Sequence, residues 1–237
     1  MRPERPTLFC PVKMACEILS PKWTIQILAE LWWGSSRFNE LRRGIPGISP
    51  ALLTKRLKEL QNNGLVDRIE DPVSGAVEYV RTPAAVELEP IIQGLGEWSY
   101  RNTNVHDTRC HAEPRSFIWH LRHNIDTSFL PNRRVVFQFT FPEQAHDDRV
   151  FWIVCKPGEP VDVCYIDPGY DVDLFVSAKL EVMVSVFFGY TRLLSEIEKE
   201  QIFLSGHMPL ARSMGDWLVL SSYAQRRNII LANSVKP

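Results

Sequence analysis

One stretch of the sequence, residues 48–64, constrains the fold more than any other. Ser49 is a favourable helix N-cap, Pro50 suits the first helical position, and Gly64 suits the helix stop. Leucines at helical spacing give this segment one apolar face, while small, basic and polar residues point away from it. The apolar positions are Leu53, Leu57 and Leu60, and the outward ones are Ala51, Leu52, Lys55, Glu59 and Asn62. The pattern predicts a helix that packs on one side and presents the other.

The flanking segments place this helix in a recognisable arrangement. Residues 36–43 predict a short helix, and Gly-Ile-Pro-Gly at 44–47 predicts a turn, so two helices meet in a helix-turn-helix. Downstream, residues 65–69 and 76–80 alternate as strands, and 71–75 is a turn-forming loop of hairpin length. A helix pair followed by a hairpin predicts a winged helix.

Charge supports a nucleic-acid interface only locally. The formal net charge of the 237 residues is −1, yet residues 37–58 hold six basic residues and a single acid, Glu40. On composition alone a solvated helical face is the better explanation; the helix-turn-helix and the hairpin favour DNA. We expect the start of the 48–64 helix to face the major groove, nearby cations to contact phosphates, and the hairpin to touch the adjoining backbone. The groove-facing residues are Ser49, Pro50, Ala51 and Lys55, the phosphate contacts Arg37, Arg43, Arg56 and Lys58, and the hairpin contacts Arg68 and Ser74.

An ordered series of blocks between residues 10 and 98 resembles the HxlR-type winged-helix transcriptional regulators. The blocks are Cys10 to Val12, Pro21 to Leu28, Arg37 to Leu41, Pro46 to Ser49, Leu53 to Leu57, Leu60, Gly64 to Val66 and Val77 to Tyr79. The resemblance implies a bacterial homodimer that binds palindromic operator DNA. Two features depart from the family pattern: Pro83 replaces an acidic or polar residue, and a long C-terminal half follows.

The resemblance also draws attention to Cys10, because some HxlR-type regulators sense oxidants or electrophiles through a cysteine at this place. Lys13 or a helix beginning near Pro11 would favour a thiolate there. The alternative is a small residue that packs the first helix at a dimer interface, and residue type alone does not decide between them.

The remaining cysteines and the termini favour a cytoplasmic protein. Five cysteines, odd in number and widely spread, do not form a secreted disulfide framework. The N-terminus has no signal-type apolar run, and no stretch reaches membrane-span length. His106, Cys110 and His111 lack the paired spacing of a zinc site, so we expect no metal and no cofactor.

Two further helices are expected in the N-terminal half. Residues 22–33 repeat apolar side chains every four positions and predict a scaffold helix. Residues 84–101 predict a helix kinked at Pro90, with an apolar stripe that would pair two protomers. The stripe comprises Val86, Ile91, Leu95 and Trp98. We therefore assign residues 1–101 to a DNA-binding and dimerisation domain and 102–114 to a linker.

Residues 115–237 predict a second domain, so that the chain as a whole is α+β. After a helix at 115–125, the pattern becomes strand-like, and short turns between the strands indicate an antiparallel sheet covered by helices. The expected strands are 134–141, 150–155, 161–166, 172–176 and 201–205, and the expected helices 180–188, 193–200 and 209–217.

This order of elements, over residues 117–220, resembles the sterol carrier protein type two family. The resemblance is carried by Asp173 to Ser177, the apolar helix ending at Gly189, Ile202 to His207, and Leu210 to Trp217. It implies an apolar tunnel for a hydrophobic small molecule; the alternative is an α+β core without a cavity. The expected ligand contacts are Phe137, Phe139, Phe141, Trp152, Phe175, Met183, Phe187, Met214 and Trp217.

The sequence offers little support for catalysis, since it lacks a nucleophile elbow, a Walker loop, a dinucleotide fingerprint and a metalloprotease motif. We therefore expect a non-enzymatic, one-component transcription regulator: a homodimer on operator DNA, modulated by a hydrophobic effector in the C-terminal domain. The alternatives are a lipid carrier that uses its winged helix for dimerisation and a redox regulator acting through Cys10.

Overall fold

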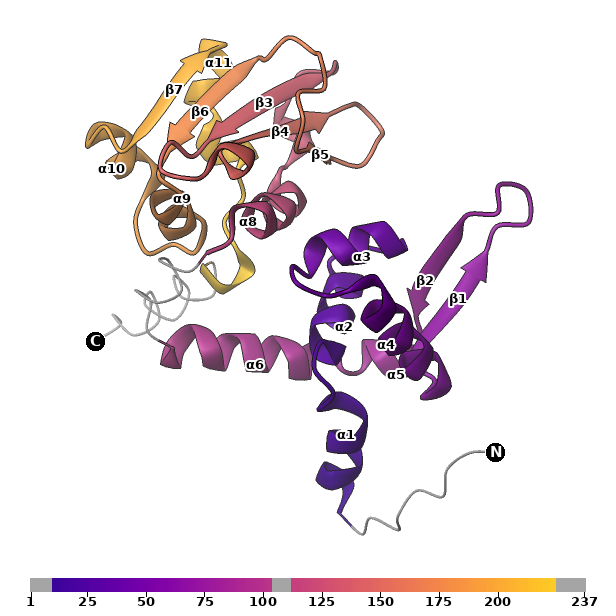
Figure 1. The fold of residues 1–237 in the computed structure, drawn as a ribbon. Helices are drawn as coiled ribbons and strands as arrows, with labels where there is room; N and C mark the ends of the chain where they lie inside the picture. The colour runs from indigo at the N-terminus through magenta and orange to yellow at the C-terminus, as the bar shows by residue number, and fades with distance from the viewer. Residues whose placement is uncertain (1–9, 104–111, 225–237) are drawn as a thin grey trace. The chain divides into compact units, whose positions relative to one another are not determined.

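The computed structural model describes residues 10–103 and 112–224. The chain divides into two compact units, unit 1 (Met1–Gly96) and unit 2 (Glu97–Pro237), each with its own core. Figure 1 labels the elements of both. Most of the expected linker, together with His106, Cys110 and His111, lies outside the described residues.

Unit 1 is a helical bundle with a two-stranded hairpin. Its helices in chain order are α1 (Pro11–Leu19), α2 (Thr24–Trp32), α3 (Phe38–Gly44), α4 (Pro50–Asn62), α5 (Pro83–Val86) and the first part of α6 (Glu89–Asn102). The hairpin consists of β1 (Val66–Glu70) and β2 (Val77–Arg81), which pair antiparallel with Val66 opposite Arg81. The winged-helix arrangement predicted from the sequence is confirmed.

The leucine face of α4 forms the centre of this core. Leu53, Leu57 and Leu60 are at most 1% exposed and pack with Ile27 of α2 and Leu41 of α3. Burying a leucine side chain contributes about 1.5–3 kcal/mol, so these contacts hold α4 firmly against the scaffold. The side of α4 that remains outward is thereby fixed.

The prediction of a single kinked helix over residues 84–101 is wrong. Thr82 caps the short helix α5 by accepting from the Ala85 amide, and α5 ends at Val86. A new helix, α6, begins at Glu89, with Pro90 in its first turn. Proline has no amide hydrogen to donate, which is harmless in a first turn and disruptive further in, so it starts a helix here and does not kink one.

Unit 2 contains a five-stranded sheet and short helices. Its strands are β3 (Val135–Thr140), β4 (Val150–Cys155), β5 (Asp162–Cys164), β6 (Leu174–Ala178) and β7 (Ile202–Gly206). Its helices after α6 are α8 (Pro114–Leu121), α9 (Leu180–Phe187), α10 (Leu193–Glu198), α11 (Met208–Arg212) and α12 (Met214–Trp217), with 3-10 turns at Arg122–Asn124, Thr127–Phe129 and His146–Asp148.

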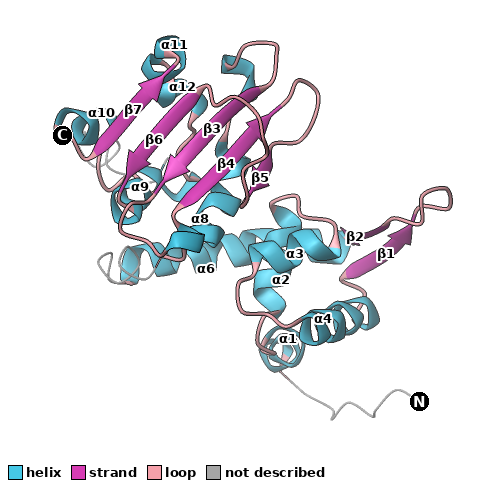
Figure 2. Cartoon of the chain, turned by 45° about the horizontal axis from the view of Figure 1, so that its top comes forward, coloured by secondary structure: helices cyan, strands magenta, loops and turns pink. Residues whose placement is uncertain are grey.

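The sheet is mixed, so the expectation of a purely antiparallel sheet is wrong. The strand order is β5-β4-β3-β6-β7, and β6 runs parallel to β3 while the other pairs are antiparallel. The connection after β5 therefore crosses to the far side of β3 and does not turn back as a hairpin (Figure 2). This order places β3, whose Phe137 and Phe139 are fully buried, in the middle of the sheet.

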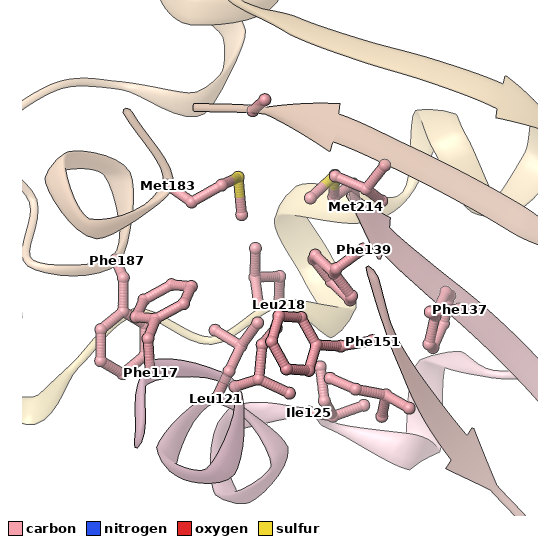
Figure 3. Close-up of a cluster of buried hydrophobic side chains, with 14 of the residues drawn as sticks. Phe117, Leu121, Ile125, Phe137, Phe139, Phe151, Met183, Phe187, Met214 and Leu218 are labelled. Carbon is pink, nitrogen blue, oxygen red and sulfur yellow. The ribbon is translucent and has the colours of Figure 1, made fainter. Parts of the chain in front are cut away.

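One face of the sheet packs against helices to form the core of unit 2. Phe137 and Phe139 project from β3 toward residues of α8, α9 and α12, as Figure 3 shows. The Phe137 ring stacks on Trp217 with centroids 4.3 Å apart, and Phe117 meets Phe187 edge-on at 5.8 Å. Such aromatic pairs add about 0.5–1.5 kcal/mol each beyond their area burial.

Candidate nucleic-acid interface

The helix-turn-helix is held in shape by two carboxylates. Glu40 in the first turn of α3 accepts from the amides of Ser36 and Arg37, at 2.9 and 3.1 Å, and so fixes where α3 begins. Glu30 of α2 is 2% exposed, accepts from the Ser35 hydroxyl at 3.0 Å, and lies directly against Gly44 at the end of α3. Glu30 therefore orders the connection between α2 and α3, and Glu40 orders the start of α3.

Helix α4 presents an outward face of small and basic residues. Ser49 caps it by accepting from the Leu52 amide at 3.3 Å, and Pro50 occupies its first position. The outward face consists of Ala51, Thr54, Lys55 and Lys58, all of which are exposed. Within the described ranges, neither lysine has an ion-pair partner. The predicted contact residues Ser49, Pro50, Ala51, Lys55 and Lys58 are all exposed, and so is Thr54, which the sequence did not single out.

Arg56 lies differently from the other predicted phosphate contacts. Its guanidinium donates from Nε to the carbonyl of Lys22 at 3.0 Å and forms an ion pair with Glu59, and its side chain is 15% exposed. The carbonyl acceptor belongs to the segment just before α2, where Trp23 adopts a left-handed backbone conformation with φ 80°. Arg56 therefore ties α4 to the scaffold. No local pattern could reveal this, since the acceptor is 34 residues away.

The arginines of α3 remain near the surface. Arg37 is 61% exposed and pairs with Glu78 of β2 at 3.5 Å, while Arg42 and Arg43 are exposed in the last turn of α3. An exposed ion pair of this kind contributes at most about 1 kcal/mol, so Arg37 can exchange its partner for a phosphate at little cost.

The tip of the wing is ordered by Asp71. Its carboxylate accepts from the amides of Ser74 and Val73, at 2.8 and 2.7 Å, and these hydrogen bonds lower the pKa of Asp71. Val73 is 95% exposed at the tip, and Arg68 pairs with Glu70 at 2.9 Å on the first strand. The wing therefore projects an ordered tip, and the charge of Arg68 behind it is partly neutralised.

Apolar side chains are exposed on α1 and α6. On α6, Ile91, Leu95 and Trp98 follow one another at spacings of four and three and are 55, 49 and 60% exposed. Helix α1 buries none of its residues, although Val12 and Met14 are apolar. Such stripes are typical of surfaces covered by another molecule.

Cys10 stands at the N-cap position of α1, where its side chain makes no capping hydrogen bond, and it is half-buried. A second free cysteine, Cys16, is exposed on the same helix.

Seven of the nine expected ligand contacts come together in unit 2. They are Phe137, Phe139, Phe141, Met183, Phe187, Met214 and Trp217, and all are at most 6% exposed in one core. Trp152 and Phe175 are not among them: both are paired with Gln138, so they lie on the opposite face of the sheet, where Phe175 is 39% exposed. The two groups cannot line one cavity.

A helix-turn-helix with a basic outward helix and a hairpin wing defines a winged-helix DNA-binding protein. The model of the HxlR-like helix-turn-helix family matches residues 18–107. The chain is 36% identical over 97 residues to the HTH-type transcriptional regulator YybR of Bacillus subtilis (strain 168), covering 40% of this chain and 78% of YybR. The present chain therefore belongs to the HxlR-like family of transcriptional regulators.

Other relatives and solved structures cover a similar share of the chain. An HTH-type regulator of Methanothermobacter thermautotrophicus is 38% identical over 90 residues, covering 38% of this chain and 69% of that protein. The reduced form of the transcriptional regulator YodB from B. subtilis is 31% identical and covers 41% of this chain and 97% of that chain, with a TM-score of 0.37. The redox regulator HypR in its reduced form is 34% identical. The match covers 42% of this chain and 99% of the HypR chain, with a TM-score of 0.38.

No helix of the described residues combines the length and the apolar character needed to cross a membrane. Nor do those residues contain a group of three or more His, Cys, Asp or Glu that could hold a metal ion.

Proposed function

We propose that the chain is a homodimeric transcription regulator that inserts the start of α4 into the major groove of operator DNA. The observation that carries the proposal is the outward face of α4, where Lys55 and Lys58 are exposed beside Ala51 and Thr54 and lack acidic partners in the described structure. A rigidly packed helix that presents cations and small side chains suits a groove lined by phosphates.

Dimerisation is supported by the exposed apolar stripe of α6 and by the exposed apolar residues of α1. A two-fold dimer would cover these apolar residues and would provide two copies of α4 for two half-sites about one DNA turn, roughly 34 Å, apart. In this proposal Arg37, Arg43 and Lys58 contact phosphates, Ser49 and Lys55 face the groove, and the wing with Arg68 and Ser74 contacts the neighbouring backbone.

The test is the salt dependence of DNA binding by the full-length chain, measured by fluorescence anisotropy on a duplex selected from a random library. Lys58→Ala removes a proposed phosphate contact, so it should weaken binding and reduce the slope of log K against log salt concentration by about 0.9. Lys179→Ala removes an exposed charge from unit 2 and should leave the slope unchanged. An unchanged slope and affinity for Lys58→Ala, with intact dimerisation, would favour the alternative of a carrier protein that uses its winged helix only to dimerise.

Two parts of the proposal concern regulation. We propose unit 2 as the effector-binding part, supported by the Met183 and Met214 thioethers that enter its aromatic core, because flexible methionines adapt to varied apolar ligands. The stacked rings of Phe137 and Trp217 would have to separate to admit a ligand. Native mass spectrometry of the gently purified protein tests this: one hydrophobic molecule per protomer supports an effector, and a ligand-free dimer contradicts it.

Redox control through Cys10 is the other proposal. Its test, by oxidant treatment of a Cys10→Ser variant, is given in the Discussion.

A further inference from the structure

Thr54 adds an apolar group to the outward face of α4, which otherwise carries the charges of Lys55 and Lys58. Its hydroxyl donates to the carbonyl oxygen of Pro50, one turn earlier, at 2.9 Å. The donor of this hydroxyl is therefore already used within the helix. What Thr54 presents to its exterior is chiefly its methyl group.

A second methyl group lies beside it. Ala51 is three residues earlier, and side chains at that spacing are neighbours on a helix surface, with about 5–6 Å between their Cβ atoms. Both residues are exposed, and both lie in the first two turns of α4, the part that enters the groove. The two methyl groups together form a small apolar step next to Lys55.

Hydrogen-bond donors in these turns come from two side chains. Pro50 has no amide hydrogen, the Ser49 hydroxyl accepts from the Leu52 amide but keeps its own hydrogen to donate, and Lys55 carries an ammonium group. Apolar contact is therefore left to Ala51 and Thr54. In the major groove, the one apolar feature of the bases is the C5-methyl group, and side chains such as Ala and the methyl of Thr contact it.

We infer that Ala51 and Thr54 together read the C5-methyl group of a pyrimidine in each half-site, and that they thereby select thymine. This inference rests on the proposed function, since it names the base chemistry that the proposed groove contact would recognise. A simpler explanation of the Thr54 hydrogen bond is that it only satisfies the hydroxyl on a solvated face. The two explanations differ in what removal of a methyl group should do.

Two substitutions at position 54 separate methyl from hydroxyl. Thr54→Ser keeps the hydroxyl and its bond to Pro50 and removes the methyl. Thr54→Val keeps a methyl and removes the hydroxyl. The probes are duplexes that carry the motif selected by the wild-type full-length chain from a random library, with each thymine in turn replaced by deoxyuridine, which lacks only the C5-methyl.

At one thymine per half-site, deoxyuridine should weaken wild-type binding about fourfold, which corresponds to the burial of one methyl-sized group. Thr54→Val should keep this preference. Thr54→Ser should lose most of the preference for thymine over deoxyuridine, because one of the two methyl groups that make the distinction is gone and only Ala51 remains. Deoxyuridine outside the selected motif is the control. If the critical pyrimidine is cytosine, replacing it with 5-methylcytosine should strengthen wild-type binding, and this result would overturn the choice of thymine.

The inference fails if no thymine in the motif is sensitive to deoxyuridine, or if Thr54→Ser retains the full preference. In those cases the proposed function still stands, because a motif was selected. If the wild-type chain enriches no sequence at all, the proposed function fails and the inference fails with it.

Discussion

Arg56 donates from its Nε to the carbonyl oxygen of Lys22, 34 residues earlier, at 3.0 Å. This bond joins α4 to the segment that precedes α2, where Trp23 has a positive φ. The contact gives Arg56 a role in holding α4 in place, although its charge and position in the sequence suggested a phosphate contact.

Arg56→Lys should therefore destabilise unit 1 more than it weakens the electrostatic part of DNA binding. The lysine keeps the charge but cannot serve Lys22 and Glu59 together, and a loss of about 1 kcal/mol in unfolding free energy is expected. Hydrogen exchange of the α2 and α4 peptides measures the loss. In Arg56→Gln, which also removes the charge, the salt slope of DNA binding should still match that of wild type. A slope reduced by about 0.9 in Arg56→Gln would return Arg56 to the phosphate contacts.

The sequence predicted the winged helix because its signals are local. Ser49, the leucine stripe and the turn before α4 each act within a few residues, and the structure confirms all three. The parallel pairing of β3 with β6 was not predictable in this way, because packing across the whole core decides which strands become neighbours. The same holds for Arg56, whose acceptor is distant in sequence. It also holds for Thr54, because only the hydrogen bond of its hydroxyl to Pro50 shows that the methyl group is the part left to face outward.

Gly44 is required by the carboxylate of Glu30. A Cβ built on Gly44 would collide with that carboxylate, which is buried and bonded to Ser35. Gly44→Ala should cost about 2 kcal/mol of unfolding free energy, as overpacking of a closed site does. Gly215→Ala is the control: nothing lies within 4 Å of its added Cβ in α12, and the change should not destabilise the protein by more than a few tenths of a kcal/mol. Thermal unfolding, with hydrogen exchange to locate the change in unit 1 or unit 2, distinguishes the two variants, and equal effects at both sites would contradict the argument.

The described cysteines should differ sharply in reactivity. Cys155 is 3% exposed at the end of β4, and burial raises its pKa to about 12, so at pH 8 almost none of it is thiolate. Cys10 and Cys16 are more accessible. Brief treatment of the native protein with iodoacetamide, followed by peptide mass spectrometry, should label Cys10 and Cys16 and spare Cys155 until the protein is unfolded. Labelling of native Cys155 at a comparable rate would show that the end of β4 opens readily.

Redox control through Cys10 makes a separate prediction. If Cys10 is the sensor, an oxidant such as diamide should release DNA from the wild-type protein, and Cys10→Ser should keep its DNA under the same treatment. Cys16→Ser is the control, since it removes the exposed thiol of α1 and leaves Cys10 in place. Release of DNA from Cys10→Ser, measured by anisotropy before and after oxidant, would exclude Cys10 as the sensor.

The apolar stripe of α6 gives the sharpest test of the dimer. Leu95 is 49% exposed between Ile91 and Trp98 on one face of the helix. In a two-fold interface a Leu95→Glu change is present in both protomers. Each copy should lose about 2 kcal/mol of binding free energy from the burial of the leucine, and together they should raise the dimer dissociation constant roughly a thousandfold. Light scattering during size-exclusion chromatography should then show monomers at micromolar concentration. Leu194→Glu alters a leucine of α10 that is 70% exposed and should leave the dimer intact. If both variants remain dimeric, α6 is not the interface, and α1, whose Val12 and Met14 are also exposed, becomes the surface to change next.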